Sequence, residues 1–400
     1  MSRRRELAAG LLVSLGALLF VFGVLEGVAR LALPRTDSVV VQNLKPAVPV
    51  ARRTQQRRVP IAPNEALFRE TEAGGRMYPN VQVIVRKHQV SGRRVEIRTN
   101  ALGYRGDEVP PKTAQDFRIL VLGDSITLAD YALEDETYPA RMEQRLREYR
   151  NATKKIRVIN AGTAGLDLRS EFMVLMETGL STKPDIVVEG LYLNDAAPSF
   201  TLKATVLPPY VRWSRFLTFV VGRIDSLRAL FRYRTREHDW RPAQARFLAH
   251  HPVTVEGDWR DSDTTFNQEI ADTFFDWGYA WSEDAWARMG ETLTLMKHVA
   301  SDHDFELFVV LFPVRQQVQS RLLRDEPQRR FEDMMRALGL PCLDLLPPLR
   351  DKFARDGHDI FYDHCHYNPE GDEFIGRLIA DTLARESRPL QSIGVSPAAR

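Results

Sequence analysis

Arg118-Ile119-Leu120-Val121-Leu122-Gly123-Asp124-Ser125 is a run of four apolar residues that ends in a glycine and two small polar residues. An unbroken Ile, Leu and Val run predicts a strand buried on both faces, as in a parallel sheet, and the glycine predicts a tight turn after it. Ligands of open α/β sheets bind at the carboxyl ends of the strands, so Ser125 is a candidate nucleophile. A serine needs a base, an orienting acid and oxyanion donors, which the rest of the chain must supply.

The same strand pattern recurs along the chain, with helical patterns between the strands. Further strands are predicted at 156–160, 185–193, 305–312 and 342–346, and helices at 137–149, 170–180, from 282 onward and at 369–386. Alternation of this kind is typical of βαβ units and predicts an α/β fold with a parallel central sheet. Because parallel strands end at one edge, polar residues after different strands are expected to meet there.

The N-terminal region has the composition of a membrane anchor. Residues 7–25 carry no charge, follow Arg3, Arg4 and Arg5, and nearly span a hydrocarbon core of about 30 Å at about 1.5 Å per residue. We interpret residues 1–6 as a cytoplasmic N-terminus and 7–33 as a single-pass anchor in the inner (cell) membrane, with the following domain on the periplasmic or extracytoplasmic side. The alternative is a cleaved signal peptide. Arginines on both flanks leave the orientation open on charge alone.

Domain boundaries follow from composition and periodicity. Residues 34–80 are rich in Pro and Arg and predict a linker, and alternation at 81–85 and 94–98 predicts a hairpin within 81–115. The main domain is assigned to 116–386, with a helical insertion at 196–281 and a disordered tail at 387–400. Within the insertion, 213–237 mixes apolar and basic residues at helical spacing, which indicates a cap helix beside the site or an interfacial helix on lipid. An aromatic cluster at 274–281 belongs to the core or forms a substrate wall.

Charge and cysteine content exclude several classes of function. The chain has 55 Lys and Arg against 53 Asp and Glu, a net charge of +2, which lacks the basic excess of a nucleic-acid-binding protein. Its two cysteines, Cys342 and Cys365, match no zinc or redox spacing, and they could pair if the domain lies outside the cytosol.

The C-terminal segment Phe361-Tyr362-Asp363-His364-Cys365-His366-Tyr367 supplies a candidate base before the last predicted helix. An Asp three residues before a His can fold back to the ring Nδ1–H, so that Nε2 is free to take a proton from Ser125. His364 and Asp359 are equally available as base and acid on spacing alone. His358, His364 and His366 also suggest a metal, but no partner of ligand spacing lies elsewhere, and we predict no metal site.

Four motifs together resemble the SGNH (GDSL-type) hydrolases, in the form of a membrane-anchored bacterial-type member. They are Gly123-Asp124-Ser125, the segment from Asn160 to Gly165, Asn194-Asp195 and Asp363-His364-Cys365-His366, and they follow the order of that family over 116–386. The resemblance implies a flavodoxin-like three-layer α/β/α fold and a triad of Ser125, His366 and Asp363. It also implies an oxyanion hole from the Ser125 and Gly165 N–H groups and the Asn194 side chain, with Gly162 as the alternative to Gly165. Tyr192 and Tyr367 depart from the usual Gly and Pro.

The resulting expectation is a serine esterase or deacylase without a cofactor, acting on an acetyl or acyl ester of a lipid or envelope glycan. The same acyl-enzyme could pass its acyl group to an alcohol, so an O-acyltransferase that modifies a cell-envelope polysaccharide is the alternative. An inactive glycan-binding module of the same fold is a second alternative, which the four intact motifs disfavour.

Overall fold

The structure is a computed structural model that describes residues 2–32, 39–43, 58–59, 67–71, 74–149, 151–196, 214–217, 219–220 and 240–396. Its centre is a five-stranded, entirely parallel sheet in the order β11-β10-β9-β7-β8. The strands are β7 (Asp116–Gly123), β8 (Lys155–Asn160), β9 (Ile186–Tyr192), β10 (Glu306–Phe312) and β11 (Cys342–Asp344). Numbered within the sheet this is the 2-1-3-4-5 order of flavodoxin-like folds, so the predicted α/β class is confirmed.

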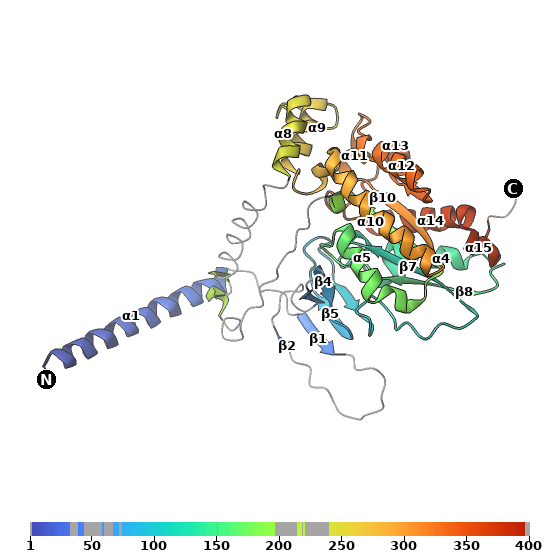
Figure 1. The fold of residues 1–400 in the computed structure, drawn as a ribbon. Helices are drawn as coiled ribbons and strands as arrows, with labels where there is room; N and C mark the ends of the chain where they lie inside the picture. The colour runs from blue at the N-terminus through green and yellow to red at the C-terminus, as the bar shows by residue number, and fades with distance from the viewer. Residues whose placement is uncertain are drawn as a thin grey trace.

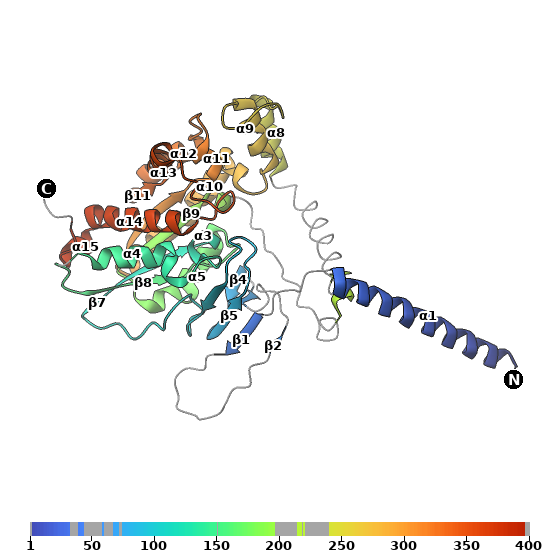
Figure 2. The same cartoon turned by 180° about the vertical axis from the view of Figure 1, so that it is seen from behind.

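Helices cover both faces of this sheet and make three layers, as Figures 1 and 2 show from opposite sides. On one face α4 (Tyr138–Arg147) packs along α14 (Pro369–Glu386), and on the other lie α5 (Leu168–Glu177), α10 (Glu283–Asp302) and α12 (Glu326–Leu338). A Cβ at Gly376 would lie 2.6 Å from the Tyr138 carbonyl oxygen, so glycine permits the close contact of α14 with α4. The inner strands β7, β9 and β10 are almost entirely buried between the layers, whereas the edge strands β8 and β11 are partly exposed.

Short elements complete the loops around the sheet. They are α3 (Ser125–Leu128), η1 (Glu134–Glu136), η2 (Gly179–Thr182), η3 (Leu193–Ala196), α11 (Arg315–Gln319) and α13 (Leu346–Asp356). Two of them, α3 and η3, begin directly where neighbouring strands β7 and β9 end. This is the point in the sheet where the strand order reverses, which in open α/β sheets is the usual ligand-binding crevice.

A second, mostly antiparallel unit precedes the central sheet. The predicted hairpin forms from β5 (Val81–Val85) and β6 (Val95–Arg98), and β1 (Val39–Asn43) and β2 (Arg58–Val59) extend it to the order β2-β1-β5-β6. A further pair is β3 (Phe68–Thr71) with β4 (Gly74–Met77). The expectation of a plain linker over 34–80 is therefore wrong for these strands, because the Val-rich β1 supplies the pairing partner that the edge of β5 requires.

The N-terminal helix α1 (Ser2–Ala32) projects away from the rest of the molecule (Figure 1). Its stretch Val13–Leu31 is long and apolar enough to cross a membrane, and most of its side chains are exposed. A single helix of this kind is consistent with a membrane anchor or with a signal sequence.

The described part of the insertion is helical, as predicted. It contains α8 (Arg241–His250), α9 (Asp263–Asp272) and η4 (Trp277–Trp281), together with a short helical stretch at 215–217 and 219–220. Most of the predicted amphipathic helix at 213–237 lies outside the described residues. The aromatic cluster belongs to the core, since Phe274, Trp277, Tyr279 and Trp281 are buried.

The C-terminal segment is ordered further than the sequence predicted. Residues 387–400 were predicted to be disordered, yet α15 (Arg388–Ser392) forms there and the chain is described to residue 396. Leu390, Ile393 and Val395 are buried against the main core, and the Ile393 carbonyl accepts a hydrogen bond from the Thr153 N–H at 2.8 Å. Burial of these apolar side chains offsets the entropy lost on ordering the tail.

Candidate active site

Ser125 is the first residue of α3, at the end of β7. Gly123 has a φ of +145°, and a Cβ there would lie 2.1 Å from Thr127 Oγ1, so only glycine fits this turn. Asp124 caps the helix, with its Oδ1 accepting from the Ile126 N–H at 2.8 Å. The strand, the glycine turn and the cap together hold the partly exposed Ser125 side chain at the carboxyl edge of the sheet.

The loop before α14 brings His366 and Asp363 to this serine. Nε2 of His366 lies 3.0 Å from Ser125 Oγ, and Nδ1 of His366 lies 2.7 Å from Asp363 Oδ2. The second carboxylate oxygen of Asp363 accepts from the Cys365 and His366 N–H groups, both at 2.9 Å. The predicted residues thus form one continuous hydrogen-bonded chain across 241 positions of sequence.

Hydrogen bonds and charge keep Asp363 ionised. Burial by itself raises the pKa of this carboxyl group, but the bonds from the His366 ring and from two backbone N–H groups outweigh burial and hold the pKa well below its usual range. His364 and Asp359, the alternative base and acid allowed by the sequence, do not pair with Ser125 or with the His366 ring. Asp359 pairs with Arg315 and caps the Phe361 N–H, and His364 turns toward Asp276.

The His366 ring packs against an aromatic wall that the sequence did not reveal. Tyr131 contacts it edge-on at 4.9 Å between ring centroids, and Tyr362 lies 5.9 Å from Tyr131. The buried Arg105 fixes the loop that carries Tyr131, because its guanidinium donates to the carbonyl oxygens of Leu128, Ala129 and Ala132. The role of Arg105 here is structural, and no motif in the sequence links it to that loop.

The predicted oxyanion residues follow the strands next to Ser125. Asn194 lies in η3 after β9, and its side chain donates a hydrogen bond to the Asp124 carboxylate. Gly165 is exposed after β8 with φ +73°, and its N–H and that of Ser125 donate to no acceptor within the described residues. The N–H of Gly162, by contrast, already donates to Asn160 Oδ1 at 3.0 Å, which favours Gly165 over Gly162 as a free donor.

Buried carboxyl groups lie behind Ser125 and support the strand ends. Burial raises the pKa of Asp124 to about 6, against the opposing effects of the Ile126 N–H, His366 and Asn194. Asp195 accepts from the Tyr192 N–H at 2.7 Å, so both Asp124 and Asp195 hold backbone turns. Deeper in the fold, burial raises the pKa of Glu189 and of Glu171, and the neighbouring carboxyl groups add to the shift of Glu171.

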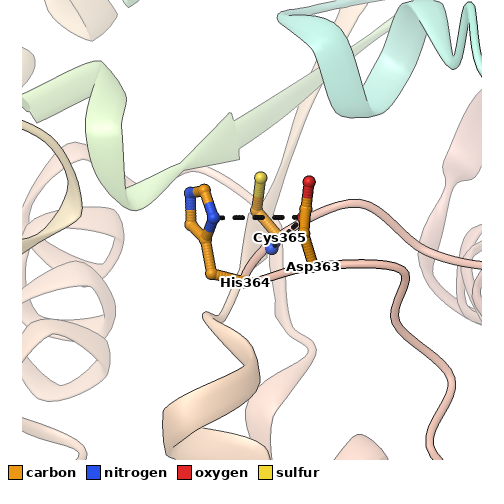
Figure 3. A group of neighbouring side chains, drawn as sticks. All are labelled: Asp363, His364 and Cys365. Carbon is orange, nitrogen blue, oxygen red and sulfur yellow. Dashed lines mark hydrogen bonds and ion pairs between the residues drawn. The ribbon is translucent and has the colours of Figure 1, made fainter. Parts of the chain in front are cut away.

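A possible metal-binding group needs separate consideration. Ligand atoms of Asp363, His364 and Cys365 lie within 4.8 Å of one another (Figure 3). However, both oxygens of Asp363 already accept hydrogen bonds, and burial raises the pKa of the Cys365 thiol well above its ordinary value. A metal needs the thiolate, so this donor set fits a metal ion poorly. Cys342 and Cys365 are both free thiols, and the disulfide alternative is not supported.

The insertion contacts the same loop at a second histidine, His364. His364 Nε2 lies 3.4 Å from Asp276 Oδ2, at the start of η4. Burial lowers the pKa of His364, but the Asp276 carboxylate outweighs burial and the net shift is upward. This contact ties the insertion to the loop that carries Asp363 and His366, and sequence spacing could not predict it.

No protein-family model and no curated protein sequence matches the chain. Among solved structures, it is similar to a lipase/acylhydrolase from Enterococcus faecalis (17% identity, 67% of this chain and 95% of that one, TM-score 0.36). It is also similar to a catalytic mutant of an acetylxylan esterase from Geobacillus stearothermophilus (14% identity, 68% and 95%, TM-score 0.38). A third is a protein of the G-D-S-L family from Desulfitobacterium hafniense DCB-2 (11% identity, 66% and 99%, TM-score 0.34). Likeness at this level assigns neither an activity nor a substrate.

Proposed function

We propose that this chain is a serine ester hydrolase of the SGNH type, with Ser125 as nucleophile, His366 as general base and Asp363 as the acid that orients it. The observation that carries this proposal is the hydrogen-bonded chain from Ser125 Oγ through the His366 ring to Asp363. Ser125 lies where the strand order of the sheet reverses, between β7 and β9, and an ester carbonyl can reach its hydroxyl in the crevice there.

The geometry supports a two-step reaction. Ser125 Oγ attacks the ester carbonyl while Nε2 of His366 takes the hydroxyl proton, and Asp363 stabilises the imidazolium that forms. The oxyanion accepts hydrogen bonds from the Ser125 and Gly165 N–H groups and the Asn194 amide. The tetrahedral intermediate then releases the alcohol, which receives the proton from His366. Water, deprotonated by His366, attacks the acyl-enzyme and frees the acid and Ser125.

Location and substrate class extend this proposal. We infer that α1 anchors the chain in the cell membrane as a single span and that the catalytic domain lies on the extracytoplasmic side. The apolar Val13–Leu31 stretch supports the membrane span. The extracytoplasmic side follows from the anchor together with the resemblance to the SGNH hydrolases, because the arginines on both flanks do not fix the orientation. An acetyl or acyl ester on a lipid or envelope glycan is the substrate class that such a location offers.

The test is covalent trapping combined with turnover. A fluorophosphonate should label wild-type protein on Ser125, and p-nitrophenyl acetate should be hydrolysed. Ser125→Ala should abolish labelling and lower kcat by about 10⁶, the cost of removing a triad nucleophile. Ser181→Ala, at an exposed serine, is the matched control. Equal labelling of Ser125→Ala would refute the nucleophile, and a product that forms only with an added alcohol acceptor would assign acyl transfer instead.

A further inference from the structure

A carboxylate interrupts the apolar part of α1. Glu26 lies within the Val13–Leu31 stretch, yet it is only 8% exposed. A charged side chain in a membrane-spanning segment is costly unless it finds partners, and it therefore marks a functional contact by default. The contact in this chain is with the insertion, almost 190 positions away in the sequence.

Four donors converge on the two oxygens of Glu26. Its Oε2 accepts from Ser214 Oγ at 2.6 Å and from the Phe216 N–H at 3.0 Å. Its Oε1 accepts from the Arg215 N–H at 3.1 Å and from Arg30 Nε at 2.7 Å. Ser214 is fully buried and its Oγ also accepts from the Leu217 N–H at 3.0 Å. The carboxylate thus serves as a cap for the short helical stretch of the insertion.

Two further contacts join the same segments. Arg215 Nη1 donates to the Arg30 carbonyl oxygen at 2.9 Å, near the C-terminal end of α1, where a positive charge is favourable. The Phe22 and Phe216 rings meet edge to face, with centroids 6.1 Å apart. Figures 1 and 2 both show the short yellow-green stretch beside the end of α1. We call residues 214–217 and 219–220 the docking segment.

Other apolar side chains of α1 are exposed and available to contact lipid. Val13, Leu18, Phe20, Val24, Val28 and Leu31 are all at least half exposed. A bilayer is the occupant that an apolar helix of this length fits. The docking segment then lies at the level where the anchor leaves the hydrocarbon core, and its partly exposed Phe219 and the basic Arg215 suit the headgroup region.

We propose that Glu26 docks the insertion onto the membrane anchor, so that the docking segment rests in the lipid headgroup layer. The insertion begins directly after Asn194 and returns to the triad loop through Asp276, so docking holds one flank of the active site against the membrane. If the proposed esterase function holds, on which this second part rests, the substrate is an ester held in or on the bilayer.

Cross-linking in native membranes tests the docking without reference to activity. In full-length protein, cysteines at Phe22→Cys and Phe216→Cys should form an intrachain cross-link on oxidation, detected by peptide mass spectrometry. Phe20→Cys with Phe216→Cys is the matched control, because position 20 lies on the exposed side of α1. Adding Glu26→Leu should lower the cross-linked fraction about tenfold or more, since bonds to a charged group are lost, and Glu26→Gln should lower it less. Equal cross-linking of the two cysteine pairs would overturn the docking.

Activity on two esters tests the substrate class. Glu26→Leu should lower hydrolysis of methylumbelliferyl oleate in phosphatidylglycerol vesicles by about tenfold and leave hydrolysis of soluble methylumbelliferyl acetate unchanged, because the triad is untouched. An equal effect on both esters, or on neither, would overturn the membrane-held substrate. A wild-type protein that hydrolyses neither ester and takes no fluorophosphonate label would refute the esterase function, while the cross-link would still report on docking.

Discussion

Asp363 uses both carboxylate oxygens within one short loop. One oxygen holds the backbone turn through two N–H groups, and the other fixes the His366 ring with Nδ1 toward the acid and Nε2 toward Ser125. A single side chain therefore sets both the loop shape and the ring orientation. The D-x-x-H spacing allows the contact between Asp363 and His366 because both lie within four consecutive residues, but only the resemblance to the SGNH hydrolases selected this pair over His364 and Asp359.

Asp363→Asn tests that arrangement. The amide can keep the backbone contacts, but it favours the wrong ring tautomer and cannot stabilise an imidazolium, so we expect kcat for ester hydrolysis to fall by about 10⁴. Asp359→Asn, four residues earlier and paired with Arg315, is the matched control and should retain most activity. A wild-type rate in Asp363→Asn would transfer the orienting role to another acid.

Asn194→Ala tests the oxyanion donor. Loss of this proposed donor should reduce kcat by about 10²–10³ with little change in KM. The hydrogen bond from the Asn194 amide to the substrate carbonyl oxygen strengthens only as negative charge develops on that oxygen in the transition state. Steady-state kinetics with p-nitrophenyl acetate measure both constants, and the exposed Asn151→Ala provides the control. A change confined to KM would argue that Asn194 binds substrate and not the oxyanion.

At the scale of elements, the strands and helices that carry the site were the most predictable part of the chain. The helix predicted at 369–386 is observed as Pro369–Glu386, because Asn368 caps it and Pro369 suits its first turn. Local chemistry fixes such boundaries. The order of strands in the sheet and the contact between α4 and α14 depend on residues far apart in sequence, and no local pattern contains them.

Strand β9 carries a buried titratable group, Glu189, whose pKa is raised to about 7 chiefly by burial. Its folded pKa exceeds the ordinary value of 4.5, so the folded chain binds more protons than the unfolded chain between the two values. The contribution of this pKa shift to the free energy of unfolding is complete below about pH 4.5 and is lost as the pH rises through about 7. Glu189 is paired with Leu122 of β7, beside the turn to Ser125, so this loss acts on the strands of the site.

Glu189→Gln should remove part of this pH dependence. We expect the Tm of Glu189→Gln in detergent to rise relative to that of wild type as the pH increases from about 5 to about 8, because the amide stays neutral. The free energy of unfolding of wild type should fall by at most about 1.4 kcal/mol per pH unit from this one group. Glu291→Gln, on the exposed side of α10, should follow wild type. Parallel Tm curves for Glu189→Gln and wild type would contradict the assignment.

At the scale of the whole molecule, the chain joins an apolar helix, a small antiparallel sheet and a three-layer α/β domain. One contact of the small sheet with the α/β domain lies close to the proposed triad. Arg93 of the hairpin forms an ion pair with Glu136 and hydrogen-bonds to Tyr362, next to the aromatic wall behind His366. The small sheet thereby supports the loop that carries Asp363 and His366.

The anchor gives a whole-molecule prediction. If α1 is retained and not cleaved, the intact mass of the mature protein should include the N-terminal residues, and the chain should stay with membranes after an alkaline wash. Protease added outside intact spheroplasts should then cut the catalytic domain. A mass that starts after residue 32, with release into the soluble fraction, would identify α1 as a signal sequence.

The sequence alone determined the α/β class, the strand that presents Ser125 and the short loop in which Asp363 meets His366, because apolar runs, glycine turns and a four-residue loop encode these features locally. The tertiary structure alone decided that Tyr131 packs against the His366 ring, that Asp276 meets His364, and that Glu26 caps the docking segment of the insertion. Those contacts join segments up to 235 positions apart in the sequence, and they arise from the packing of whole elements, which no local residue pattern contains.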